Sequence, residues 1–114
     1  MKIKSFLIAF STVVVIACST VKTIEMDQST IERVKTVYPT LSLEDLNKGK
    51  KLYETKCSLC HGLDKPSART AEKWKHIVPE MVEIANKKSE VIASNEADLI
   101  LKYLVSMSKT YQTN

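Results

Sequence analysis

Five consecutive residues, Cys57-Ser58-Leu59-Cys60-His61, hold the side chains of this chain that are best suited to chemistry. Two thiols separated by two residues and followed directly by an imidazole have the spacing of covalent c-type haem attachment. Each thiol would add across one haem vinyl group to form a thioether, and His61 would bind the iron from the proximal side. Similar spacings also occur in zinc sites and thioredoxin-like redox motifs, so the surrounding sequence must separate these possibilities.

A helix is expected to lead into this motif. Ser42 can cap its N-terminus, Glu44 and Asp45 occupy its first turn, and apolar residues recur at helical spacing as far as Tyr53. Gly49 is either a flaw in that helix, costing about 1 kcal/mol, or a point of close crossing by another helix, because glycine has no Cβ. With the cysteines eight residues further on, the crossing is the favoured interpretation.

Gly49, Tyr53 and the Cys-x-x-Cys-His motif together resemble the small monohaem class I cytochromes c. The resemblance continues in a final helix from about Glu96 to Ser108, where Tyr103 would pack at the glycine of the N-terminal helix. It implies an all-α domain, a cytochrome c-like bundle of about three to five helices wrapped around one covalent haem c. The stretch between His61 and Met81 is shorter than the usual family pattern.

Three residues that follow the motif could contact the haem or its iron ligand, Pro66 by the resemblance and Arg69 and Trp74 by the chemistry of their side chains. Pro66 would accept a hydrogen bond from the second ring nitrogen of His61, or it is a simple loop proline. Arg69 and Trp74 could hydrogen-bond the haem propionates, or they are a surface arginine and a core tryptophan.

Thr70 and the Ser94-Asn95-Glu96 stretch are candidate helix caps, and Pro79 would either kink the helix after Thr70 or begin a second one.

Met81 is the expected distal iron ligand. It lies on the apolar stripe of the helix that follows the haem motif, and the preceding loop could carry that helix round the haem edge. A methionine on such a stripe is usually ordinary core, so this choice depends on the haem motif. His76 is expected to face solvent, Met107 suits core packing, and Met26 falls in a presumed tether.

The N-terminus has a secretory signal pattern, with Lys2 and Lys4 before a short apolar run that extends to residue 17. The run ends in Val15-Ile16-Ala17-Cys18, which resembles a bacterial lipobox whose cysteine receives the lipid. An ordinary signal peptide with an incidental cysteine and an uncleaved anchor are the alternatives. We expect a signal peptide at 1–17, a lipid-anchored and partly helical tether at 18–41 with a short helix near 30–38, and the haem domain at 42–110. The alternative for the short helix is that it packs onto the haem domain.

Composition agrees with these assignments. With 114 residues the chain has room for one small domain, and its aromatic content of 6% leaves a thin core that a buried porphyrin would complete. Three cysteines leave no free thiol if Cys18 takes lipid and the motif pair takes haem. Lys2 and Lys4 carry two of the four net positive charges and would be removed, and haem propionates would bring the balance near zero. Charge therefore does not indicate nucleic-acid binding.

With both axial positions filled, the protein would be a one-electron carrier and not an enzyme. It would exchange electrons with respiratory or dehydrogenase partners in transient encounters, from a lipid anchor in the bacterial cell envelope facing the periplasm or outer surface. The alternatives are a five-coordinate haem sensor, a haem subunit of a larger oxidoreductase complex, and a zinc module using Cys57, Cys60, His61 and His76.

Overall fold

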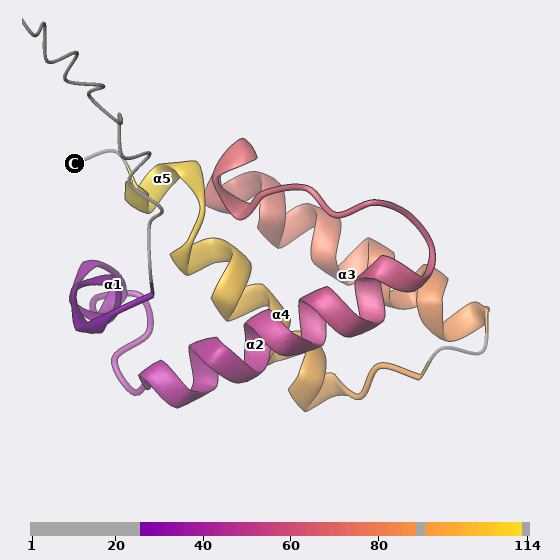
Figure 1. Ribbon diagram of the computed structural model, residues 1–114, viewed down its shortest axis with the longest axis horizontal. Coiled ribbons are helices and arrows are strands. Elements are labelled where there is room, and N and C mark those ends of the chain that lie inside the picture. The colour runs from indigo at the N-terminus through magenta and orange to yellow at the C-terminus, as the bar shows by residue number, and fades with distance from the viewer. Residues whose placement is uncertain (1–25, 89–90, 113–114) are drawn as a thin grey trace, which may run out of the picture.

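The computed structural model describes residues 26–88 and 91–112, and every regular element within them is helical (Figure 1). The helices are α1 (Gln28–Val34), α2 (Leu43–Lys56), α3 (Ala71–Lys87), α4 (Ser94–Ser106) and α5 (Lys109–Gln112), with short 3-10 turns η1 (Cys57–Leu59) and η2 (Pro66–Ala68). The predicted all-α class is confirmed. The expected signal peptide and Cys18 lie outside the described residues.

Helix α2 begins where its cap signal predicts. The Ser42 hydroxyl accepts a hydrogen bond from the Asp45 backbone N–H at 3.1 Å, and the Asp45 carboxylate accepts one from the Ser42 N–H at 3.1 Å. This reciprocal cap satisfies two backbone donors that the first turn leaves without a partner inside the helix. The helix ends at Lys56 and runs directly into η1, so its C-terminal end delivers Cys57 and the rest of the motif.

The α2 and α4 helices cross at Gly49. A Cβ atom added to Gly49 would lie only 2.8 Å from the Cβ of Tyr103 and closer still to the carbonyl oxygen of Leu99. The two backbones can therefore approach this closely only because Gly49 has no side chain. The expected crossing and the expected place of Tyr103 are both confirmed.

Gly49→Ala is expected to destabilise the fold by about 3 kcal/mol, because the new methyl group must push α4 away from α2. Chemical denaturation followed by circular dichroism would measure this change. Gly62→Ala is the matched control, since a Cβ at Gly62 meets nothing within 4 Å. Equal stability of the two variants would contradict the close crossing.

Helix α3 starts after Thr70, whose hydroxyl accepts from the Lys73 N–H at 3.3 Å as its cap signal predicts. It continues through Pro79 as one helix, so the proline does not begin a second one. The last long helix begins earlier than expected, because Ala93 and not Ser94 is its cap residue. The Glu96 carboxylate accepts from the Ala93 N–H at 3.0 Å, which is the half of a capping box that does not need a polar side chain at the cap residue.

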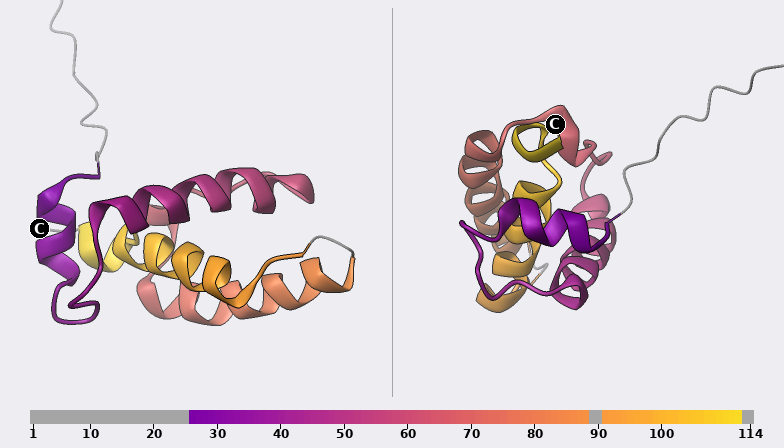
Figure 2. Two further views of the ribbon diagram at one scale, coloured as in Figure 1. Left: turned by 90° about the horizontal axis from the view of Figure 1, so that it is seen from below. Right: turned by 90° about the vertical axis from the view of Figure 1, so that its left-hand side faces the viewer.

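The three long helices form the body of the fold (Figure 2). Helix α4 packs against both α2 and α3, and Leu46, Ile100, Leu104 and Val105 are almost completely buried. Within the described residues, no helix is both long and apolar enough to cross a membrane.

Helix α1 packs on this body, against α4. Ile31 and Val34 occupy one of its faces and are buried with Leu41 in the main core, which explains why the segment folds back onto the bundle. We expected residues up to 41 to serve as a tether with a partly ordered end. From Gln28 onward the segment is instead part of the packed structure, and its helix ends at Val34, earlier than predicted.

Candidate functional site

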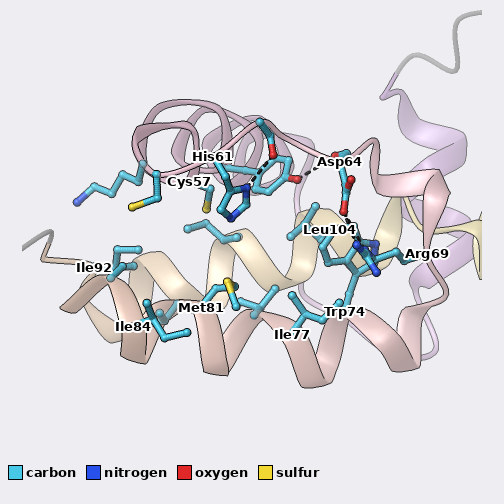
Figure 3. A pocket seen from close by; sticks show the side chains of 18 of the residues that line it. Cys57, His61, Asp64, Arg69, Trp74, Ile77, Met81, Ile84, Ile92 and Leu104 are labelled. Carbon is cyan, nitrogen blue, oxygen red and sulfur yellow. Dashed lines mark hydrogen bonds and ion pairs between the residues drawn. The ribbon is translucent and has the colours of Figure 1, made fainter. Parts of the chain in front are cut away.

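A cavity of about 550 Å³ lies between the C-terminal end of α2 with η1 on one side and α3 on the other, with α4 at its base (Figure 3). Its volume is within the range of roughly 300–1,000 Å³ that is common for small-molecule sites. The apolar part of its lining comes mainly from α3 and α4 and comprises Trp74, Ile77, Val78, Met81, Val82, Ile84, Ala85, Ile92, Ile100 and Leu104. The cavity therefore suits a largely apolar ligand.

Both motif cysteines line this cavity with free thiols. Cys57 is half-buried at the end of α2, whereas Cys60 is exposed at the rim. Burial raises the pKa of the Cys57 thiol, and a negative charge on Cys60 would raise it further. Both effects favour the thiol form of Cys57 over the thiolate, and in thioether formation the S–H would add across a vinyl group.

His61 lies beside the cysteines and also lines the cavity. Its Nδ1 is 2.7 Å from the carbonyl oxygen of Gly62. When Nδ1–H donates to this carbonyl, Nε2 is left with a free electron pair for a metal ion. The prediction that the Pro66 carbonyl accepts the hydrogen bond from His61 is wrong. That carbonyl accepts the Trp74 indole N–H at 2.8 Å, and Pro66 is not part of the cavity lining.

Met81 lines the cavity from α3, on the side opposite His61 (Figure 3). The other candidate ligands do not reach it. Met107 is 9% exposed and packs in the core with its sulfur 3.8 Å from the Gln112 side-chain nitrogen. His76 is exposed on α3, and Met26 packs on the core outside the cavity. Met81 is thus the one of the four candidates that the fold brings to the motif.

Polar side chains close one end of the cavity. Arg69 donates through Nε to the Asp64 carboxylate at 3.0 Å, and its guanidinium lies 5.6 Å from the centre of the Trp74 ring. The Tyr53 hydroxyl donates to the Asp64 carbonyl oxygen at 2.8 Å. Arg69 already has a protein carboxylate as partner and Trp74 has its own acceptor, so neither side chain needs a haem propionate to be satisfied. Asp64 was not among the residues expected at this site.

Tyr103 does not line the cavity. Its ring packs behind Tyr53, with 6.1 Å between the ring centres, and burial raises the pKa of its hydroxyl to about 12. We also expected Tyr103 to pack on the haem or to hydrogen-bond it; in this structure it is a packing residue at the crossing of α2 and α4.

Within residues 26–88 and 91–112, no group of three or more His, Cys, Asp or Glu side chains is placed to hold a metal ion. The exposed His76 and the motif are not gathered into such a group, so the zinc module gains no support from the described part of the chain.

The residues of the cavity fit a covalently held haem. The two thiols lie at one wall, the apolar side chains of α3 and α4 offer a surface for a macrocycle, and an imidazole and a thioether flank the space from opposite sides. The largely apolar lining would bury the faces of a macrocycle, and each Å² of apolar surface removed from water contributes about 25 cal/mol.

The chain matches no protein-family model, no curated protein and no solved structure.

Proposed function

We propose that this protein is a membrane-tethered, cytochrome c-like one-electron carrier with one covalent haem. One observation carries the proposal: a single cavity presents Cys57, Cys60 and His61 on one wall and Met81 on the opposite wall. Four side chains with these chemistries are what covalent attachment and two axial bonds require.

Each residue would have a definite role. Cys57 and Cys60 would hold the macrocycle at the wall formed by α2 and η1, while His61 and Met81 would take the two axial positions of the iron. A haem iron with this ligand pair exchanges single electrons, and the thioether raises its reduction potential. If His61 and Met81 both bind the iron, a substrate would have no site on it, which favours a carrier over an enzyme.

The arrangement also suggests where electrons would pass. Cys60 and His61 are exposed, so a haem attached there would have an edge near solvent. The distant walls from α3 and α4 are apolar and would keep water from the opposite face. Redox partners would meet the exposed edge in small, transient contacts.

Covalent haem can be tested on the wild-type chain, produced in a bacterium that attaches haem to exported proteins. We expect a haem-type visible spectrum and a haem stain that persists on a denaturing gel. A colourless protein from such a host would refute the proposal.

The anchor is a separate part of the proposal, since Cys18 lies outside the described residues. Cys18→Ser should abolish fatty-acid labelling and move the protein from the membrane fraction to the soluble envelope fraction, while haem staining stays unchanged. Labelling that persists in the variant would contradict a lipid on Cys18. The variant should leave the membrane fraction because it would lack acyl chains. Each CH₂ of such a chain contributes about 0.8 kcal/mol when buried in a bilayer.

A further inference from the structure

Three side chains from three helices converge on the short segment 91–93 between α3 and α4. Lys56, the last residue of α2, donates from Nζ to the Val91 carbonyl at 2.7 Å. Asn86 on α3 accepts from the Ile92 N–H at 2.7 Å and donates to the Ile92 carbonyl at 3.2 Å. Glu96 on α4 accepts from the Ala93 N–H at 3.0 Å. We call Lys56, Asn86 and Glu96 the polar clasp.

An ion pair completes the polar clasp. Lys56 Nζ lies 3.1 Å from the Glu96 carboxylate, and the two side chains are 24% and 27% exposed. Ion pairs such as Lys102–Asp98 join residues four apart within one helix, whereas Lys56–Glu96 joins α2 to α4. Partial burial reduces the screening of this pair by water and salt, so it holds the helices together more firmly than an exposed pair would.

The polar clasp lies at one end of the cavity. Lys56 and Ile92 line the cavity themselves, and Figure 3 shows Cys57, Ile84 and Ile92 at the end opposite Arg69 and Trp74. Lys56 directly precedes Cys57, and Asn86 lies on the same helix as Met81, five residues further on. The polar clasp therefore connects the wall that carries the cysteines to the wall that carries Met81.

We propose that Lys56, Asn86 and Glu96 are positioning residues that keep the cysteine wall and the Met81 wall at the separation an iron–thioether bond requires. The inference rests on the proposed function, because it concerns the ligand that this function assigns to Met81. The clasp acts from one end of the cavity, as the contacts of Asp64, Arg69 and Trp74 act from the other. Loosening it increases the fraction of molecules in which Met81 has left the iron.

Competition by imidazole measures that fraction in the intact haem-loaded protein. A free ligand binds the ferric iron only after the thioether leaves, so its apparent affinity rises with the population of the detached state. We expect Lys56→Met and Asn86→Ala each to lower the apparent dissociation constant of imidazole about fivefold or more. Lys56→Met retains the aliphatic stem of lysine and removes only its charge and donors.

Lys102→Met is the matched control, because Lys102 has a similar exposure of 29% and its ion pair stays within α4. It should change the dissociation constant by less than about twofold. Glu96→Gln serves as a second test if Lys56→Met does not fold, since it weakens the ion pair while keeping an acceptor for the Ala93 N–H. A residue that only stabilised the fold would shift the unfolding midpoint and leave imidazole binding in the folded state unchanged.

The outcomes separate the two proposals. If the wild-type chain attaches haem but the clasp variants bind imidazole like the control, the clasp inference is overturned and the proposed function stands. If the wild-type chain attaches no haem, both are overturned.

Discussion

The double variant Cys57→Ala with Cys60→Ala is expected to give no haem band on a denaturing gel and to lose most of its cooperative helical structure. The loss of the band follows from the chemistry, because Cys57 and Cys60 are the thiols that line the cavity among residues 26–88 and 91–112, and a thioether needs a thiol. The loss of structure follows from the cavity itself. Without covalent attachment, its apolar walls on α3 and α4 must collapse on one another or be filled by water.

The size of the effect can be compared with that of core substitutions. Truncating one buried aromatic side chain costs about 3–5 kcal/mol, and a haem would contact more of the apolar lining than one such side chain does. A loss of about 5 kcal/mol would already be a third or more of the about 5–15 kcal/mol that stabilises a small domain. Circular dichroism at 222 nm and thermal unfolding would measure it. We expect a broad, weak transition in the double variant and a sharp one in the wild type.

Cys18→Ser is the control for this experiment, because it removes a cysteine that is not part of the Cys-x-x-Cys-His motif. It should keep both the haem band and the sharp transition. A double variant that remained well folded without haem would show that neither the bundle nor the apolar walls of the cavity depend on the cofactor for their structure.

Local signals in the sequence predicted the helices well. Caps at Ser42 and Thr70 are confirmed because the side chain that caps and the backbone N–H that it binds are three residues apart. The Gly49–Tyr103 crossing was predictable for a different reason: a glycine inside an otherwise good helix needs an explanation, and close packing supplies one. The approach of Met81 to the cavity followed from its place on an apolar stripe.

Contacts between distant residues were not predictable in this way. Nothing in the sequence indicates that the Asp64 carboxylate accepts a hydrogen bond from Arg69. The same is true of the hydrogen bond from the Trp74 indole to the Pro66 carbonyl and of the one from the Ile92 N–H to the Asn86 side chain. These pairs depend on how the loops fold back over the helices, and any of several polar residues could have supplied each partner. The packing of α1 was the less favoured alternative, because the three apolar residues Ile31, Val34 and Val37 on a short polar segment are a weak signal.

Met81→Ala should open the sixth coordination position of the iron. The oxidised variant is expected to lose the weak near-infrared band of a sulfur–iron bond, and the reduced variant should bind carbon monoxide that the wild type excludes. Met81 is half-buried on the cavity wall opposite His61, and its sulfur is the soft ligand available on that side. The reduction potential should also fall, because a thioether favours ferrous iron more than water or a second nitrogen ligand does.

Met107→Ala is the matched control, since it removes a methionine that is more deeply buried but lies outside the cavity. It should cost about 2–5 kcal/mol of stability through the space left in the core, and it should leave the near-infrared band and the exclusion of carbon monoxide unchanged.

Met81→His offers a further check: a second imidazole should again exclude carbon monoxide without restoring the sulfur band. If the wild type itself binds carbon monoxide, the haem is five-coordinate and a ligand-sensing role replaces the carrier role. If Met107→Ala loses the band and Met81→Ala keeps it, the distal ligand is Met107, and α4 would have to move from its position in this structure.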